Sequence, residues 1–193
     1  MRRVRGKGKH RELIAATLSA VALAAASPNV AVAAADIFIK IGDIKGESTD
    51  DKHKDEIEVL SWSWGVSGPF RNSPKQPQQP VGPGQPACAA DLSIMKVVDK
   101  ASPVLFAKAA AGATIPSATI SVRKAGGEQQ DFLVITLSDV IVTSVAQSGA
   151  GGEDRPSESV SFAFSGASIS YTQQSVAGAV SAPVVGTVPA SCR

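Results

Sequence analysis

The stretch Ala118–Val145 decides the fold, because it predicts a β-hairpin with a long apolar return arm. Its first arm, Ala118–Arg123, alternates apolar and polar side chains, as a half-buried strand does. The segment Ala125–Glu128 then contains the glycines Gly126 and Gly127, which reach positive φ without a Cβ clash. A turn is therefore expected between the two arms.

The return arm, Asp131–Val142, is the longest apolar run after residue 35, and both of its faces are apolar at the start. A strand of this kind is expected to be covered on two sides, by the core and by a second layer or a neighbouring subunit. A fully buried helix could give such a run too, but the β-branched residues and flanking glycines favour a strand. The side chains expected to make core and subunit contacts here are Phe132, Leu133, Ile135 and Leu137.

Charge separates the beginning of the chain from the rest. Of 193 residues, 19 are Lys or Arg and 17 are Asp or Glu, and residues 1–35 hold six of the basic residues and one acid. The remainder has 13 basic and 16 acidic residues, a formal charge of −3. No basic excess is left that would indicate a nucleic-acid partner.

Residues 1–35 have the three parts of a secretory signal peptide: a basic head over 1–12, the apolar stretch Leu13–Ala26, and small residues in Val30–Ala35. The apolar stretch is shorter than the about twenty residues that span a bilayer. We therefore expect cleavage after Ala33 or Ala35, export to the periplasm or the cell exterior, and no stable membrane insertion afterwards. An uncleaved membrane anchor and a mis-assigned start codon are the alternatives.

Two further strands are expected before residue 66. Asp36–Ile44 alternates as a half-buried strand, and the charged connection Gly46–Asp55 leads to a second strand over Glu56–Gly65. One face of that second strand would carry Leu60, Trp62 and Trp64, and the other Ile57, Val59 and Ser61. Two tryptophans at this spacing could form a ligand-stacking platform, but Trp62 and Trp64 are more often core or interface residues because tryptophan buries a large area.

The middle of the chain predicts a loop, a strand and a helix. Residues 67–87 are rich in proline and glutamine, which predicts an extended loop. Asp91–Val98 is expected to be a short strand. The helix is expected to start at the N-cap Ser102 with Pro103 as its first residue, and to stop at Gly112.

The last part of the chain predicts a glycine-rich loop and two strands. The loop, Gln147–Ser157, lacks the Gly-Lys-Ser/Thr ending and the following helix of a phosphate-binding loop. The strands are expected over Ser159–Phe164 and Ala167–Thr172. Residues 174–193 form either a C-terminal tail or a divergent last strand.

The sequence offers little for catalysis or metal binding. After the leader only His53 remains among the histidines, and neither a second histidine nor a cysteine lies at metal-ligand spacing from it. The acids of Asp50–Glu58 are interpreted as a solvated loop, with calcium binding as the minor alternative. We expect no enzyme activity, no cofactor and no metal site.

Cys88 and Cys192 are the two cysteines of the chain. In an exported protein they are disulfide candidates, and one bridge would tie the end of the proline-rich loop to the C-terminus. Two unpaired thiols or an intermolecular bond are the alternatives.

Several blocks together resemble the Hcp family, the haemolysin co-regulated proteins that form the inner tube of bacterial type VI secretion systems. Each block alone is weak, but their order and combination are specific, and they cover about residues 36–173. The blocks are Asp36–Ser48, Glu56–Gly65, Asp91–Ile94 with Lys96, Asp99, Lys100, Ser102 and Pro103, Lys124–Glu128, Ile135–Leu137 with Val140, and Gly151–Arg155 with Glu158.

The resemblance implies a mainly β fold, a small β-barrel of two antiparallel sheets with one flanking α-helix, over residues 36–173. It further implies hexameric rings that stack into a tube and carry effectors, with other type VI components as partners. Candidate ring-stacking loops are 67–87 and 149–155, and the second of these contains Gly151, Gly152, Glu153, Asp154 and Arg155. Gly126 and Gly127 are the candidate residues of the hairpin turn.

Three features depart from the family pattern: the leader, the proline-rich composition of loop 67–87, and the segment Pro183–Pro189 in place of a Gly-Trp-Asp/Asn-like end. They support an alternative function, an exported stand-alone Hcp-like domain that binds another protein and is not part of a tube.

Overall fold

The computed structural model describes residues 35–67, 88–124, 130–152, 154–173 and 181–192. The expected leader up to residue 34, most of the proline-rich loop, the turn residues Gly126 and Gly127, and Glu153 lie outside the described residues. The described residues all belong to one compact unit, Ala33–Arg193.

The described part of this unit is mainly β, with one helix, as expected. In chain order the elements are β1 (Ala35–Ile41), β2 (Ile57–Glu58), β3 (Ser61–Ser63), β4 (Val66–Ser67), β5 (Cys88–Ala89), β6 (Leu92–Val97), α1 (Ser102–Ala111), β7 (Thr114–Lys124), β8 (Asp131–Ser148), β9 (Ser157–Ala163), β10 (Gly166–Tyr171) and β11 (Val184–Val188).

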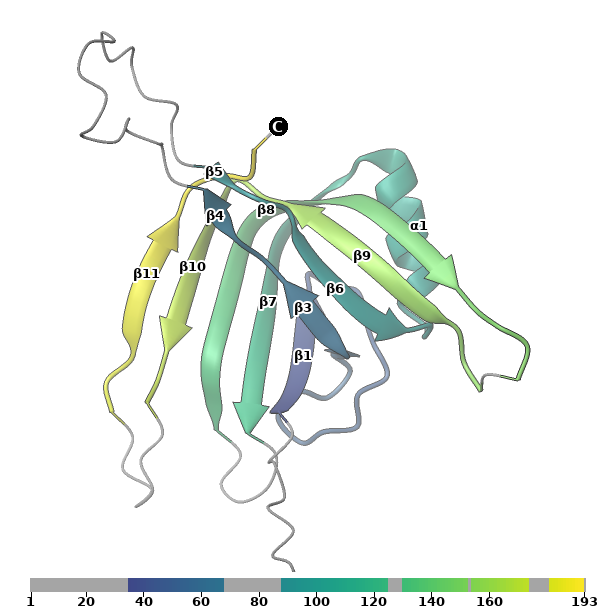
Figure 1. Cartoon of the computed structure of the whole chain (residues 1–193), viewed down its shortest axis with the longest axis horizontal. Coiled ribbons are helices and arrows are strands. Elements are labelled where there is room, and N and C mark those ends of the chain that lie inside the picture. The colour runs from purple at the N-terminus through teal and green to yellow at the C-terminus, as the bar shows by residue number, and fades with distance from the viewer. Residues whose placement is uncertain (1–34, 68–87, 125–129, 153, 174–180, 193) are drawn as a thin grey trace, which may run out of the picture. The chain divides into compact units, whose positions relative to one another are not determined.

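The strands form two antiparallel sheets. The large sheet follows the order β2-β1-β7-β8-β9-β6-β3, and β10 pairs with both β8 and β11. A second, two-stranded sheet contains β4 and β5. The large sheet curls, and α1 packs against β8 at one side of it (Figure 1).

The predicted hairpin is confirmed as β7 and β8, in a register that pairs Ala118 with Leu137 and Ile120 with Ile135. β8 continues past the predicted end at Val142, because it changes partner. Its first half pairs with β10 and its second half with β9. Asp139, with φ of 49°, lies between the two halves and marks the irregularity where the partner changes.

The single strand predicted over Glu56–Gly65 is wrong, because the segment is broken in two. Its first part, β2, pairs with β1, and the Val59 N–H donates to the Ile37 carbonyl at 2.9 Å. The next N–H, of Leu60, donates to the Met95 carbonyl of β6 at 2.7 Å. The strands at the two ends of the sheet order, β2 and β3, are therefore successive pieces of one chain segment. The change of partner also shifts the alternation, so Leu60 is 63% exposed and does not share a buried face with Trp62 and Trp64.

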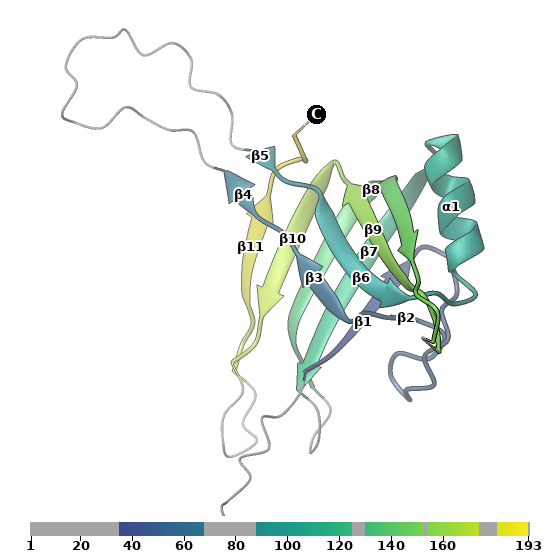
Figure 2. The ribbon, with the colours of Figure 1, turned by 45° about the vertical axis from the view of Figure 1, so that its right-hand side comes forward.

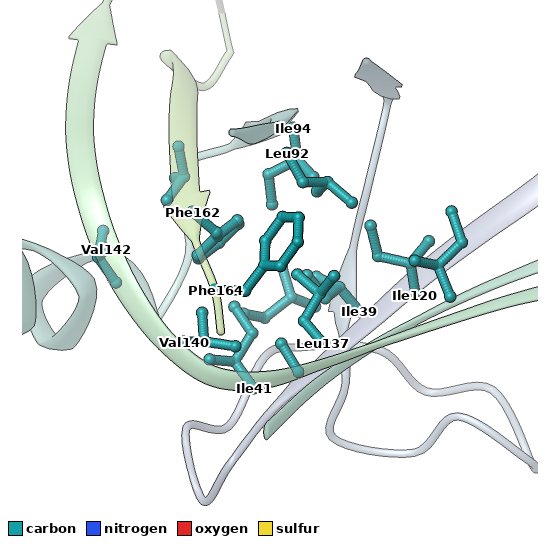
Figure 3. Close-up of a cluster of buried hydrophobic side chains, with 14 of the residues drawn as sticks. Ile39, Ile41, Leu92, Ile94, Ile120, Leu137, Val140, Val142, Phe162 and Phe164 are labelled. Atoms are coloured by element: carbon teal, nitrogen blue, oxygen red, sulfur yellow. The ribbon is translucent and has the colours of Figure 1, made fainter. Parts of the chain in front are cut away.

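The core lies inside the curl of the large sheet. Isoleucine, leucine, valine and phenylalanine side chains from six strands converge there, and Figure 3 shows their labelled members pointing toward one another. Ile39, Ile120, Leu92, Leu137 and Phe162 are fully buried. At about 1.5–3 kcal/mol for each fully buried large apolar side chain, this cluster is the main source of stability.

The predicted helix is confirmed, and it stops at Gly112 as predicted. Its N-terminal cap differs from the prediction. Gly112 adopts φ of 57° and its N–H donates to the Ala109 carbonyl, as a left-handed C-cap does. Ala101 occupies the N-cap position and no side chain caps it. The Ser102 hydroxyl, expected as the cap, is buried and belongs to a polar cluster described below.

The C-terminal segment 174–193, expected to be either a tail or a divergent last strand, contains a strand. β11 pairs with β10 over five residue pairs, from Ala167–Val188 to Tyr171–Val184. This strand is almost entirely exposed, with Val184 72% and Val185 61% accessible. No helix in the described ranges has the length and apolarity required to cross a membrane.

Candidate functional site

The side chains predicted for core and subunit contacts divide into two groups. Ile135 and Leu137 are fully buried, so they pack only within their own subunit. The other group is partly buried and packs against the core with one side. Its members are Trp62, Trp64, Phe132 and Leu133. The second group retains the surface that a neighbouring chain could contact.

Aromatic contacts hold two members of the half-buried group, Trp64 and Phe132, in place. The Trp64 indole N–H donates to the Ala90 carbonyl at 3.1 Å, and its ring meets Phe164 edge to face. Phe132 makes an edge-to-face contact with Tyr171 at 6.5 Å between ring centroids. These contacts give Trp64 and Phe132 structural partners within the fold.

The glycine-rich loop predicted for ring stacking is exposed where it is described. Gly151, Gly152, Asp154 and Arg155 all face solvent. The Arg155 guanidinium lies 3.7 Å from the Glu47 carboxylate, and both side chains are about half exposed. A pair of this kind contributes little to stability.

The acids of Asp50–Glu58 form a folded loop against β1 and are not only a solvated connection, which corrects the sequence interpretation. His53 is 5% exposed and stacks on the Phe38 ring at 4.4 Å between centroids. Its Nδ1 lies 2.9 Å from the Glu56 carboxylate and its Nε2 lies 3.1 Å from the Asp131 carboxylate. Both ring nitrogens are thus engaged within the fold.

Arg123 ties the same loop to the hairpin. Its guanidinium donates to both carboxylate oxygens of Asp50, at 2.9 and 2.7 Å, and to Asp36 at 3.2 Å. It also lies over the Phe38 ring, 5.1 Å from the centroid. The hydrogen bonds from Arg123 hold the pKa of Asp50 well below its ordinary range, and those to Asp50 raise the pKa of Arg123.

A second polar cluster is buried between β6, β9 and the start of α1. The Lys96 ammonium donates to Asp99 at 2.7 Å, to the Val97 carbonyl at 2.8 Å, to Ser102 at 3.1 Å and to Glu158 at 3.2 Å. Gln147 also donates to Glu158 at 2.7 Å. Lys96 and Glu158 are fully buried, and such a pair is tolerated only when its hydrogen bonds are satisfied, as they are here.

Sequence reasoning missed both clusters, although one signal was available. Leu92, Ile94 and Lys96 share one face of β6, and Glu158, Val160 and Phe162 share one face of β9. The apolar face of β6 therefore ends at a positive charge, Lys96, and that of β9 at a negative charge, Glu158. The two residues lie opposite each other in the paired strands. For Arg123 and Asp50 no local pattern of this kind exists, because a loop and a strand far apart in the chain bring them together.

Neither cluster forms a metal centre. Within the part of the chain that the structure describes, no group of three or more His, Cys, Asp or Glu side chains is arranged to hold a metal ion. Both clusters consist of paired opposite charges, and they fasten a loop and a helix to the sheet.

Cys88 and Cys192 form a disulfide, with their Cα atoms 5.2 Å apart. The intramolecular bridge favoured from the sequence is the arrangement that the structure has. It joins the beginning of β5 to the segment that follows β11.

Comparison with known proteins gives a consistent result. The family model described as "Type VI secretion system effector, Hcp" matches residues 38–171. The chain is 44% identical over 147 residues to protein hcp1 of Pseudomonas aeruginosa, which covers 76% of this chain and 88% of that protein.

Solved structures agree in sequence and in fold. A structure of a type six secretion system protein superposes with a TM-score of 0.71 at 32% identity, covering 80% of this chain and 93% of that one. Hcp1 of Salmonella typhimurium gives a TM-score of 0.63 at 37% identity, covering 81% and 95%. On the match of the family model, the identity to the Pseudomonas protein and the shared fold, the chain belongs to the Hcp family of type VI secretion system proteins.

Proposed function

We propose that this chain is a subunit of an Hcp-type tube, in which six copies form a ring and rings stack to carry secreted effectors. The observation that carries this proposal is the 44% identity to a Pseudomonas Hcp1 protein over 88% of its length. Hcp proteins are type VI secretion tube proteins, and the hexameric ring is a property of that family. Effectors and other type VI components are the partners that this role implies.

The distribution of exposed apolar side chains supports a ring. Val104 and Phe106 are exposed on α1, and Tyr171, Val184 and Val185 are exposed on β10 and β11. The elements that carry these two groups, α1 and the β10–β11 pair, lie at opposite ends of the fold (Figure 2). A ring is built from heterologous contacts, in which two different surfaces of the same chain meet, so two separate apolar surfaces are what it requires.

The role we propose is structural and not enzymatic. The best candidate base, His53, is buried and both of its ring nitrogens lie at carboxylates. A general base must reach a substrate proton, and His53 has no nitrogen available for one.

The test is the mass of residues 36–193, purified with the disulfide intact, by size-exclusion chromatography with light scattering and negative-stain microscopy. We expect six-subunit rings. Only monomers, at every concentration tried, would contradict the tube proposal.

A second candidate is an exported stand-alone domain of the same fold that binds another protein. The Cys88–Cys192 disulfide favours it, because disulfides persist in oxidising compartments and are rare in the cytoplasm. The proposed signal peptide over residues 1–35, followed by the domain 36–173 and the segment 174–193 that contains β11, supports the same candidate. Amino-terminal sequencing of the exported protein tests the leader, and a mature start at residue 34 or 36 is expected.

A further inference from the structure

The disulfide lies at a junction of four segments. Cys88 begins β5, which pairs with β4, and Ala89 forms a parallel bridge with Ser191. The Cys192 N–H donates to the Ala89 carbonyl at 2.8 Å, and the Ser191 N–H donates to the Phe164 carbonyl at 3.1 Å. The bond therefore fastens the segment that follows β11 to the edge of the fold.

β11 has little else to hold it. Val184, Val185, Gly186 and Thr187 are exposed, and among its residues Val188 packs against the core. Burial of apolar surface, the main stabilising contribution elsewhere in the fold, is thus small for this strand. Its attachment depends on the ladder to β10 and on the junction at Cys192.

β11 in turn covers one edge of β10. That edge carries the backbone groups of Ala167–Tyr171, which pair with β11 over five residue pairs. A strand edge that loses its neighbour presents unpaired N–H and C=O groups and is a template for pairing with another strand. Whether this edge is covered decides whether β10 can accept a strand from another chain.

We infer that Cys88–Cys192 is a redox latch: the disulfide holds β11 on β10, and its reduction releases β11 and opens the edge of β10. This goes beyond the proposed function and concerns the single subunit, because in a ring a neighbouring chain would also cover Val184 and Val185. The residue Cys192 is exposed and Cys88 is half-buried, so an external thiolate can reach the bond.

The chemistry is exchange with a dithiol reductant. One thiolate of the dithiol attacks a sulfur of the bond, which forms a mixed disulfide and frees the other cysteine as a thiolate. The second thiol of the reductant then displaces the remaining cysteine. The dithiol is oxidised to its disulfide, two electrons pass to the protein, and Cys88 and Cys192 each end with one proton.

The test is amide hydrogen exchange of the full chain, measured by mass spectrometry in a brief labelling pulse with and without dithiothreitol. We expect the amides of Val184–Val188, and those of β10 that face β11, to exchange ~10-fold faster or more after reduction, as local opening of one strand predicts. The amides between β7 and β8 should stay protected in the same pulse.

The double variant Cys88→Ser/Cys192→Ser is the matched control. It should exchange like the reduced protein, and dithiothreitol should not change it further. Unchanged protection of β11 after complete reduction would overturn the latch. Equal loss of protection in β7 and β8 would overturn it as well, because the bond would then hold the whole fold and not one strand.

Discussion

Asp50 and Arg123 are 73 residues apart in the chain, yet the Arg123 guanidinium donates to both carboxylate oxygens of Asp50. Arg123 is almost fully buried and Asp50 largely so. A guanidinium that donates twice to one carboxylate fixes the geometry of both partners. The pair therefore anchors the loop that carries His53 onto β7.

The lowered pKa of Asp50, caused chiefly by its hydrogen bonds from Arg123, makes this anchor dependent on pH. In the unfolded chain Asp50 should titrate near the ordinary aspartate value of about 3.9. Below that pH the unfolded state binds the proton that the folded state resists, so the stabilisation is present at neutral pH and declines as the pH falls.

Asp50→Asn should therefore lower the free energy of unfolding most at pH 7, and the difference from the unchanged protein should shrink progressively below about pH 4. Urea denaturation at pH 7, 5 and 3 measures it. Asp51→Asn is the matched control, because Asp51 is exposed, and it should show no such trend. If Asp50→Asn lowers the free energy of unfolding by the same amount at all three pH values, the ionisation of Asp50 does not contribute to stability.

Among the elements, the connection between β1 and β2 is the one that sequence patterns describe least well. It folds back on itself through backbone bonds, with the Gly46 N–H donating to the Asp55 carbonyl at 2.8 Å and the Ser48 N–H to the Glu56 carbonyl at 3.0 Å. At Gly46 the two backbones come so close that a Cβ atom would overlap the Glu56 carbonyl. Glycine is required there for space.

Gly46→Ala should cost about 3 kcal/mol or more of unfolding free energy, because backbone and not a flexible side chain must move to admit the methyl group. Chemical denaturation measures the loss. Gly65→Ala is the control, since a Cβ at Gly65 would meet nothing within 4 Å, and it should change stability by about 0.5 kcal/mol or less. Equal stabilities of the two variants would show that the loop can open at Gly46 without cost.

For the whole molecule, the decisive feature is the segment 57–63, which bonds to β1 with its first half and to β6 with its second. Both tryptophans of the chain, Trp62 and Trp64, lie on or directly after this segment. Their fluorescence therefore reports whether the two ends of the sheet order are joined, while far-ultraviolet circular dichroism reports the sheet as a whole.

Because the segment joins both ends of one sheet around one core, unfolding should be cooperative. Tryptophan fluorescence and far-ultraviolet circular dichroism should therefore give the same denaturation midpoint at a fixed protein concentration. A fluorescence transition that clearly precedes the loss of circular dichroism would mean that the segment detaches while the sheet persists. Such a result would contradict the view that the segment holds the sheet in its curl.

The sequence by itself determined the strands with clean alternation, the β7–β8 hairpin, the helix with its stop at Gly112, and the resemblance to the Hcp family. These follow from patterns that are local, since alternation of side chains and the conformational freedom of glycine depend only on near neighbours. The pairing of Cys88 with Cys192 is favoured from the sequence because the leader predicts export to an oxidising compartment, where two cysteines allow a single intramolecular bridge.

Tertiary structure alone decided the rest. The exposure of Leu60 follows from a change of strand partner in the middle of an alternating run. The length of β8 follows from its exchange of β10 for β9 near Asp139, and the buried positions of His53, Arg123 and Lys96 follow from elements that meet only in the folded chain. In each case the energy of a residue depends on partners far away in the chain, and no local pattern contains that information.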